Sequence, residues 1–300
     1  MLKFILNLPR HTIPILHKIS EPKNEYEWIS GAPRRTDPMK DENMSVGKTI
    51  NQWIRKYIGD GKRHFTSAIV VAAGSGSRAG QPIPKQFCLL DGVPVIVRTL
   101  QAFENAEYIR EVVLAAREED LPQYELFREQ YQLKKLVRVV PGGKTRQESV
   151  LAAFEAISPK AEYVAIHDGA RCLVTPEIIG EVCHAAYLFG SAIACEKVTD
   201  TLKAEKDGFI AGTLDRSAVR AAQTPQVFRA DIYRAAAYTA KEKGTNATDD
   251  ASLVSLCGFK VRLVDCSPEN MKITNPEDFA VASAILSYRN QEDNKAGKKS

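Results

Sequence analysis

The chain reads AIVVAAGSGSR over residues 68–78 and PKQF over residues 84–87. An apolar run of strand length therefore ends in a glycine-rich turn, and two cations, Arg78 and Lys85, follow it. A glycine-rich backbone lets phosphates approach closely, and fixed positive charge beside it favours them. The stretch predicts a nucleotide-binding turn behind a buried strand. It is not a dinucleotide fingerprint, because Ala79 replaces the third glycine, and it lacks the glycine-lysine pair of a P-loop.

From residue 65 onward, strand-like and helix-like segments alternate. The predicted strands are Ala68–Val71, Val112–Ala115, Leu136–Val140, Tyr163–Ile166, Ala192–Cys195 and Val261–Val264. The predicted helices are Val95–Glu104, Leu121–Gln130, Arg146–Ile157, Pro176–Phe189, Ala230–Lys243 and Asp249–Leu256, and a last one opens at Asn275. This alternation predicts an α/β fold with a doubly wound, mainly parallel sheet. Ligands of such sheets bind beyond the carboxyl ends of the strands.

One segment breaks the alternation. Two strand-like runs, Val198–Ala204 and Phe209–Leu214, are separated by a turn that ends in Asp207-Gly208. An Asp-Gly pair between such runs predicts a β-hairpin. Because an isolated two-stranded hairpin is marginal in water, we expect this one to pack on something, with a second subunit as the natural candidate.

Composition limits the classes of partner. The chain has 300 residues, of which 44% are hydrophobic and 26% charged, with a net charge of +4. This suits one large α/β domain with an extension. The basic residues are scattered rather than gathered in a stripe, so no nucleic-acid partner is expected. No apolar run approaches the ~20 residues of a membrane span, so no membrane partner is expected either.

The cysteines show neither a disulfide pattern nor zinc-ligand spacing. They are Cys88, Cys172, Cys183, Cys195, Cys257 and Cys266. We interpret them as reduced thiols in a reducing compartment, which predicts a cytoplasmic location.

The two ends of the chain differ from its middle. Residues 1–64 lack the strand–helix alternation and predict a poorly ordered or loosely docked extension. Their first twenty residues are basic and contain no acid, so organelle targeting is the alternative. Residues 290–300 predict a basic disordered tail. The domain proper is expected over residues 65–289.

Several polar motifs stand at predicted strand ends or in loops. They are GGKTRQES at 142–149, HDGAR at 167–171, TPQ at 224–226, TDD at 248–250 and NMKIT at 270–274. In a parallel sheet the first two converge with residues 72–85 on one rim. Each motif alone has an ordinary structural explanation as a turn, a helix cap or a surface lysine. Their joint order and spacing favour a nucleotide site.

As a set, these motifs resemble the 2-C-methyl-D-erythritol 4-phosphate cytidylyltransferase family of the non-mevalonate isoprenoid pathway, over residues 66–289. The resemblance implies a Rossmann-like nucleotidyltransferase sheet with a protruding β-hairpin dimerisation arm at about residues 197–216. It implies transfer of a cytidylyl group from CTP to 2-C-methyl-D-erythritol 4-phosphate, which releases pyrophosphate and forms 4-diphosphocytidyl-2-C-methyl-D-erythritol. CTP would be the co-substrate, Mg²⁺ would bind mainly through the CTP phosphates, and a homodimer would share its sites through the arm.

The resemblance also implies roles for single residues. The implied catalytic residues are Arg78, Lys85, Arg216 and Lys272. The implied CTP-binding residues are Ala72, Ala73, Gly74, Gly76, Gly143, Ser149, Asp168 and Gly169, with Asp168 also the metal contact. The implied residues for the sugar-alcohol phosphate are Arg171, Thr201, Arg216, Thr224, Thr248 and Lys272. A phosphomonoester with a pKa near ~6 is already a dianionic nucleophile, so cationic charge and positioning should carry catalysis without a general base.

The chain departs from the family pattern at three positions that carry no charge. Gly169 stands where the family has alanine, Cys172 where it has proline, and Ala79 where methionine is common. We expect a looser loop and unchanged chemistry.

Three other functions compete with this interpretation. A ribitol-5-phosphate cytidylyltransferase shares the nucleotide half, but residues 214–216 and 248–251 favour methylerythritol phosphate. A non-catalytic nucleotide-binding homologue conflicts with the retained cations. A Rossmann dehydrogenase conflicts with the missing third glycine.

Overall fold

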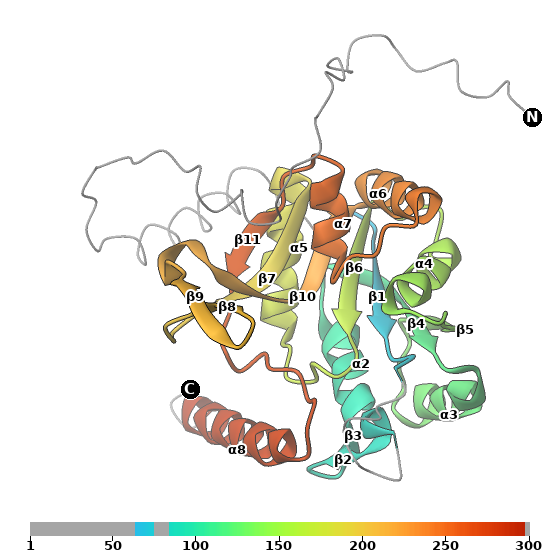
Figure 1. Cartoon of the computed structure of the whole chain (residues 1–300). Helices are drawn as coiled ribbons and strands as arrows, with labels where there is room; N and C mark the ends of the chain where they lie inside the picture. Colours follow the sequence, from blue (N-terminus) through green and yellow to red (C-terminus); the bar gives the residue numbers. More distant parts are fainter. Residues whose placement is uncertain (1–63, 75–83, 298–300) are drawn as a thin grey trace, which may run out of the picture. The chain divides into compact units, whose positions relative to one another are not determined.

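The computed structural model describes residues 64–74 and 84–297, and its centre is a seven-stranded sheet in the order β11-β7-β10-β6-β1-β4-β5 (Figure 1). In chain order the strands are β1 (Thr66–Val71), β4 (Ile109–Ala116), β5 (Leu136–Pro141), β6 (Tyr163–Asp168), β7 (Ser191–Lys197), β10 (Arg220–Arg229) and β11 (Arg262–Asp265). Neighbouring strands are parallel, except that β10 is antiparallel to both β6 and β7. The predicted α/β fold with a mainly parallel sheet is confirmed.

Helices connect the parallel strands. They are α2 (Val95–Asn105), α3 (Leu121–Gln130), α4 (Arg146–Ala156), α5 (Pro176–Phe189), α6 (Ala230–Lys243), α7 (Asp250–Leu256) and α8 (Glu277–Gly297). Short 3-10 turns are η4 (Lys85–Phe87), η5 (Glu118–Asp120) and η6 (Arg216–Ala218), and β2 (Leu89–Leu90) pairs with β3 (Val93–Pro94). Every predicted helix is present, as is every predicted strand of the central sheet, with ends that differ by only a few residues. In the predicted hairpin the first strand-like run, Val198–Ala204, is strand only from Lys203.

The sheet is covered on both faces, so it separates two apolar cores. Along β1, Ala68 and Val70 pack with residues of α2, α3 and α5, whereas Ile69 packs with residues of α4, α6 and α7. All three side chains are fully buried. Burial on both faces explains why residues 68–71 of this strand are continuously apolar instead of alternating. Burying Ile69 and Val70 contributes about 1.5–3 kcal/mol each to folding.

Strand β10 was missed by the sequence analysis, which treated residues 224–226 as a loop. Pro225, Gln223 and Gln226 are unusual in a central strand, so the sequence does not predict one here. In the structure both glutamine side chains are buried. The register of β10 against β7 shifts between Ala222 and Gln226, where the proline lies. The strand tolerates these residues because other motifs supply hydrogen-bond partners for them, as described below.

The predicted hairpin is present as β8 (Lys203–Lys206) and β9 (Phe209–Thr213). Asp207 and Gly208 form its turn with φ values of 54° and 81°, the left-handed pair that suits a tight hairpin. Phe209 and Ile210 are 78% and 71% exposed. Within the described residues the hairpin thus presents apolar side chains to solvent. That it forms a dimerisation arm stays a prediction.

The C-terminal tail differs from its prediction, because α8 continues to Gly297. The Asp278 carboxylate accepts hydrogen bonds from the backbone N–H groups of Thr274 and Asn275, at 2.6 and 2.8 Å, where the helix begins. Ala282 is buried in the apolar cluster beneath. Once a helix is started in this way, each further residue adds a hydrogen bond at little cost. Disorder from residue 290 was therefore wrong as far as residue 297.

Two expectations concern the chain as a whole. The predicted N-terminal extension lies, apart from His64, outside the described residues. In the part that is described, no disulfide joins the cysteines. Nor does any helix within those ranges have the length and apolar character to cross a membrane.

Candidate active site

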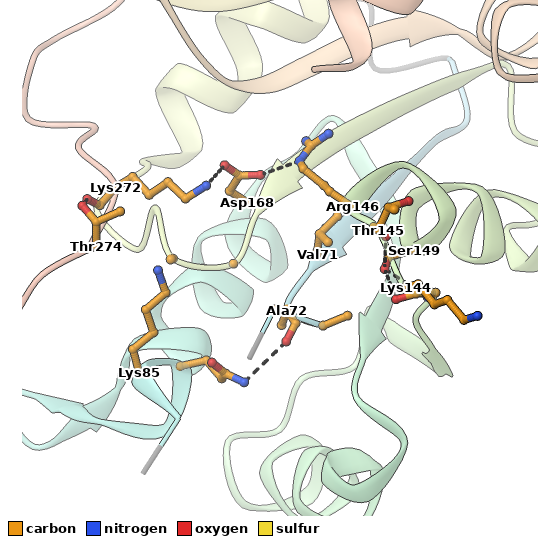
Figure 2. Close-up of a pocket in the computed structure, with 16 residues that line it drawn as sticks. Val71, Ala72, Lys85, Lys144, Thr145, Arg146, Ser149, Asp168, Lys272 and Thr274 are labelled. Carbon is orange, nitrogen blue, oxygen red and sulfur yellow. Dashed lines mark hydrogen bonds and ion pairs between the residues drawn. The ribbon is translucent and has the colours of Figure 1, made fainter. Parts of the chain in front are cut away.

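A cavity of about 400 Å³ opens beyond the carboxyl ends of β1, β5 and β6 (Figure 2). Its lining residues are Val71, Ala72, Ala73, Gly74, Lys85, Gln86, Gly143, Lys144, Thr145, Arg146, Ser149, Asp168, Gly169, Ala170, Lys272 and Thr274. The cavity therefore lies at the rim that the parallel-sheet prediction indicated.

Backbone hydrogen bonds hold the cavity's loops together. The N–H groups of Ala72 and Gly142 donate to the last carbonyls of β4, at 2.8 and 2.7 Å. Gly169 N–H donates to Val71 O at 2.9 Å, and Ile273 N–H donates to Ala170 O at 2.9 Å. The C-terminal motif is thereby attached to the loop that follows β6. Segments up to 200 residues apart in the sequence form one wall.

Nine of the predicted site residues line this cavity. They are Ala72, Ala73, Gly74, Lys85, Gly143, Ser149, Asp168, Gly169 and Lys272. Two more, Gly76 and Arg78, lie outside the described residues.

Asp168 lies between two cations in the cavity. Lys272 Nζ contacts one carboxylate oxygen at 2.7 Å, and Arg146 Nε contacts the other at 3.1 Å. Burial alone would raise the pKa of Asp168, but the charges of Arg146 and Lys272 hold that pKa well below its usual range. Asp168 is therefore a carboxylate at neutral pH. It is the single carboxylate among the residues that line the described cavity.

Lys85 approaches the same wall from the other end of the sequence. Its Nζ donates to Ile273 O at 2.9 Å, one residue after Lys272. Figure 2 shows both lysines on one side of the cavity, with Asp168 between Lys272 and Arg146. Lys85, Lys272 and Arg146 thus line a cavity with a single lining carboxylate, and the resulting net positive charge suits a polyanionic ligand.

The start of α4 forms the opposite wall and is held rigidly by its own side chains. Thr145 caps the helix by accepting from Glu148 N–H, and Glu148 accepts in return from Thr145 N–H. Ser149 Oγ accepts from Gly143 N–H at 3.1 Å. A Cβ on Gly143 would lie 2.3 Å from Glu148 Cβ, so glycine is required for this close approach.

Gly169, where the family pattern has alanine, has a packing partner that explains it. A Cβ at this position would lie 2.7 Å from Ile96 Cδ1 and 3.1 Å from Val71 O. Ile96 is fully buried, so it already fills this space. Cys172 likewise packs in the apolar cluster beneath α8. Both departures fit the local packing and leave the charged residues in place.

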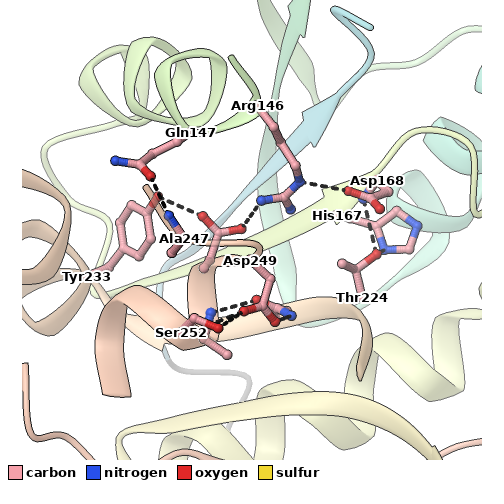
Figure 3. A network of polar contacts seen from close by, with 12 residues as sticks. Arg146, Gln147, His167, Asp168, Thr224, Tyr233, Ala247, Asp249 and Ser252 are labelled. Atoms are coloured by element: carbon pink, nitrogen blue, oxygen red, sulfur yellow. Dashed lines mark hydrogen bonds and ion pairs between the residues drawn. The ribbon is translucent and has the colours of Figure 1, made fainter. Parts of the chain in front are cut away.

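His167, next to Asp168, supports the loop from below in one defined tautomer. Its Nε2 lies 3.2 Å from Arg171 O, which only accepts, so Nε2 carries the proton. Its Nδ1 therefore accepts from the hydroxyl of Thr224, at 3.0 Å (Figure 3). That hydroxyl accepts in turn from Asp168 N–H at 3.1 Å. Complete burial lowers the pKa of His167 to about 4, which makes it a neutral structural residue at neutral pH.

This neutral histidine predicts a loss of stability in mild acid. Its folded-state pKa of about 4 lies below the ordinary value of 6.5, so the unfolded chain binds the proton first as pH falls. We expect the free energy of unfolding to fall by on the order of 2 kcal/mol between about pH 7 and pH 5 from this group alone. Urea unfolding of the wild type and of His167→Gln measures it, and equal losses in both proteins would contradict it.

The TPQ motif holds two other motifs in place. Gln226 donates to the Asp249 carboxylate at 2.7 Å and accepts from Ala251 N–H at 2.9 Å, which fixes the start of α7. The Asn270 side-chain amide donates to Gln223 Oε1 and Thr224 O, both at 2.9 Å. Since Asn270 precedes Lys272 by two residues, β10 sets the position of that lysine. Thr224 lies behind Asp168 and does not line the cavity.

Four further predicted residues also lie away from the cavity lining. Arg171 donates to Asn270 O at 2.9 Å, beneath the wall. Arg216 is exposed near the hairpin, where it donates to Thr199 O at 2.8 Å. Thr201 and Thr248 are exposed. The cavity thus includes most residues predicted for the nucleotide, but of those predicted for the second substrate it includes only Lys272 among the described residues.

Sequence reasoning missed Arg146 as a site residue, although it quoted the motif that contains it. It also gave no role to Lys144, Thr145, Gln86 or Thr274. A basic residue at the first position of a helix that follows a Gly-Gly turn was the available signal for Arg146.

The lining indicates what chemistry the cavity supports. Four of the described lining residues are cationic, Lys85, Lys144, Arg146 and Lys272, and the described lining contains neither histidine nor cysteine. With His167 buried and neutral behind the wall, the arrangement suits charge stabilisation and positioning of phosphates.

Comparison with known proteins agrees with this. The profile of the family described as 2-C-methyl-D-erythritol 4-phosphate cytidylyltransferase matches residues 66–288. The enzyme of that name from Bacillus mycoides is 40% identical over 218 residues, which cover 73% of this chain and 96% of the relative. The one from Pelotomaculum thermopropionicum is 42% identical over 226 residues, covering 74% and 94%.

Solved structures are also similar. The crystal structure of 4-diphosphocytidyl-2C-methyl-D-erythritol synthase from Anaerococcus prevotii superposes with a TM-score of 0.68 at 30% identity, covering 76% of this chain and all of that one. The Thermus thermophilus 2-C-methyl-D-erythritol 4-phosphate cytidylyltransferase gives 0.62 at 33% identity, covering 74% and 98%. Together with the family match, these likenesses show that the chain belongs to the 2-C-methyl-D-erythritol 4-phosphate cytidylyltransferase family of nucleotidyltransferase enzymes.

Proposed function

We propose that this chain transfers the cytidylyl group of CTP to 2-C-methyl-D-erythritol 4-phosphate in the cavity described above. The observation that supports this site is the convergence of Lys85, Arg146 and Lys272 on one cavity, where Arg146 and Lys272 also contact Asp168. These residues come from separate segments, and together they form a cationic pocket beside a glycine-rich loop.

The reaction needs cations rather than a base. A phosphate oxygen of methylerythritol phosphate attacks the α-phosphorus of CTP, and the bond from that phosphorus to the bridging oxygen breaks. Pyrophosphate leaves and 4-diphosphocytidyl-2-C-methyl-D-erythritol forms. The attacking phosphate is largely a dianion at neutral pH, so no side chain has to remove a proton. Lys85 and Arg78 stabilise the charge that develops at the α-phosphate, and the cavity brings two anions into line.

Different residues of the cavity lining are assigned to the phosphates, the cytosine and the ribose of CTP. We assign Ala72, Ala73 and Gly74 of the lining, together with Gly76 outside the described residues, to the phosphates. Gly143 and Ser149 read the cytosine, and their mutual hydrogen bond gives that edge a fixed shape. Asp168 and Gly169 lie near the ribose and the phosphates.

Mg²⁺ fits this set of ligands. Mg²⁺ keeps several waters and binds through one or two carboxylates plus substrate phosphates, and the described cavity offers one carboxylate, Asp168. The ion would be held by Asp168 and the CTP phosphates, and it would supply further neutralisation of phosphate charge. Lys272 and Arg146 meanwhile keep that carboxylate ionised and in place.

A homodimer completes the site in this proposal. Lys272, Arg171 and Thr224 belong to the wall or lie behind it, whereas Arg216 and Thr201 flank the hairpin. We assign Arg216, with Lys272, to the phosphate of methylerythritol phosphate, and Thr201 and Thr248 to the surrounding hydroxyl contacts. Thr224, whose hydroxyl is hydrogen-bonded to His167 and to Asp168 N–H, supports the site from behind. The hairpin with its exposed Phe209 and Ile210 would carry Arg216 to the cavity of the partner subunit. We place this dimer in the cytoplasm, consistent with cysteines that form no disulfide in the described chain.

The experiment that tests this function is a pyrophosphate-release assay with CTP and Mg²⁺. Methylerythritol phosphate and ribitol 5-phosphate are compared as acceptors at equal concentration. We expect kcat/KM to be at least about 100-fold higher for methylerythritol phosphate, because the acceptor site hydrogen-bonds its hydroxyls. Preference for ribitol 5-phosphate would favour the wall-polymer enzyme, and absence of turnover with either acceptor would favour a non-catalytic homologue.

A further inference from the structure

Asp250, the second aspartate of the TDD motif, is a buried charge to which the reaction as described gives no role. It is 1% exposed at the start of α7. One carboxylate oxygen accepts from Arg146 Nη1 at 2.6 Å, and the other accepts from the Tyr233 hydroxyl at 3.0 Å (Figure 3). Both acceptor atoms are therefore occupied by donors from other elements, α4 and α6.

The buried ion pair of Arg146 and Asp250 is explained better by the need to orient a side chain than by a gain in folding stability. Removing a carboxylate and a guanidinium from water costs several kcal/mol, and their attraction often does no more than offset that cost. An apolar pair of similar size would fill the space between α4 and α7 equally well. What the ion pair adds is a fixed direction for the guanidinium, because Arg146 Nη1 is tied to one atom deep in the protein.

Arg146 transmits this orientation to the cavity. It is the first residue of α4, so the capping box fixes its backbone. Its side chain is 30% exposed and lines the cavity, with Nε bound to Asp168 and Nη1 bound to Asp250. Among the described residues no group accepts a hydrogen bond from Nη2. That nitrogen is available to an oxygen of a ligand.

The neighbouring residue Gln147 holds α4 and the segment before α7 together. Its side-chain amide donates to Thr245 O at 3.1 Å. It also accepts from Ala247 N–H at 3.3 Å (Figure 3). The two elements that carry Arg146 and Asp250 are thus fixed relative to each other. The network of Gln147, Asp250 and Arg146 therefore forms a fixed support for Asp168 at the cavity.

We propose that Asp250 is a positioning residue for the triphosphate of CTP, and that it acts through Arg146. Asp250 and Tyr233 orient the guanidinium, which then contacts a phosphate oxygen through Nη2 and holds Asp168 through Nε. This inference rests on the proposed function, because that function places the CTP phosphates beside Asp168. Asp250 itself does not touch the substrate.

The first test is Asp250→Asn in the full-length protein. Loss of partners that orient a ligand-binding group typically costs about 10- to 100-fold, so we expect that loss in CTP affinity and in kcat/KM for CTP. KM for methylerythritol phosphate should change less than about threefold. Asp249→Asn is the matched control, because Asp249 caps α7 and does not contact Arg146. Equal losses for both substrates in Asp250→Asn would overturn the proposal.

A double-mutant cycle with Arg146→Met separates positioning from general destabilisation. If Asp250 acts through Arg146, adding Asp250→Asn to Arg146→Met should change CTP affinity by less than about twofold. A merely structural role would lower affinity by the same factor in both backgrounds, and such additivity would overturn the proposal.

A milder pair of variants keeps the test valid even where Asp250→Asn fails to fold. Tyr233→Phe removes one hydroxyl that donates to Asp250, whereas Tyr238→Phe removes a hydroxyl on the same helix that donates to Glu155. We expect CTP affinity to fall about three- to tenfold in Tyr233→Phe and to stay unchanged in Tyr238→Phe. Unchanged affinity in both variants would overturn the proposal.

The readout also separates this proposal from the function on which it rests. CTP affinity is measured by titration calorimetry with Mg²⁺ and CTP alone, which requires no turnover. Coupling between Arg146 and Asp250 in a protein that fails to convert methylerythritol phosphate would reject the assigned acceptor and keep the positioning role. Normal turnover of methylerythritol phosphate, together with additive effects of the two substitutions on CTP affinity, would reject the positioning role and keep the proposed function.

Discussion

Replacing Lys85 with alanine is expected to lower kcat about 10²- to 10³-fold while CTP affinity changes little. Lys85 Nζ lies in the cavity wall, where Ile273 O holds it at 2.9 Å. A positive charge so fixed stabilises charge that develops at the α-phosphate, and removing one such group costs about 2.7–4 kcal/mol of transition-state energy. Single-turnover rates and CTP titrations on the same preparation separate the two effects.

Lys160→Ala is the control for Lys85→Ala, because Lys160 is exposed in the turn between α4 and β6. It should leave both kcat and CTP affinity unchanged. A Lys85→Ala enzyme whose kcat stayed within about threefold of the wild type would remove Lys85 from the catalytic residues.

Mixing two inactive variants is expected to restore activity. In a twofold dimer that shares its sites through the hairpin, a Lys85→Ala subunit supplies an intact arm, and an Arg216→Ala subunit supplies an intact cavity. Each mixed dimer then holds one complete site. Random exchange of equal amounts makes about half the dimers mixed, so about a quarter of wild-type activity should return.

Subunit exchange has to be shown separately, by mixing differently tagged chains and recovering both tags together. Exchange without any recovered activity would reject the shared site and leave Arg216 to act within its own subunit. Arg216→Ala alone should strongly lower kcat/KM for methylerythritol phosphate and leave CTP affinity unchanged, because Arg216 lies away from the described cavity lining.

The order of elements was predictable because local patterns are strong in this chain. Apolar runs such as residues 68–71 are buried on both faces, and helices begin at residues with clear caps, such as Thr175 before Pro176. The rim of the cavity followed from these elements, since parallel strands end on the same side. The nine predicted residues that line the cavity come from the loops at that rim or from the C-terminal motif attached to it.

The features that could not be predicted depend on contacts between residues far apart in the sequence, which local sequence patterns do not reveal. The glutamines of β10 suggest a loop in the sequence, but in the fold they are buried and hydrogen-bonded to Asp249 and Asn270. Likewise, the pairing of Arg146 with Asp250 joins residues 104 positions apart, and neither residue is unusual by itself. Arg216 was assigned by resemblance, and one protomer does not place it at the cavity.

The reversed direction of β10 bears on how the protein can change over time. Arg220, at the start of β10, lies opposite Lys197, at the end of β7. The segment between them therefore leaves the sheet at the end of β7 and returns to it beside that point, at the start of β10. That segment can be lengthened, shortened or replaced without a shift in any strand. If Arg216 and Thr201 contact the acceptor as proposed, acceptor preference can evolve in this insert while the frame that binds the nucleotide stays constant.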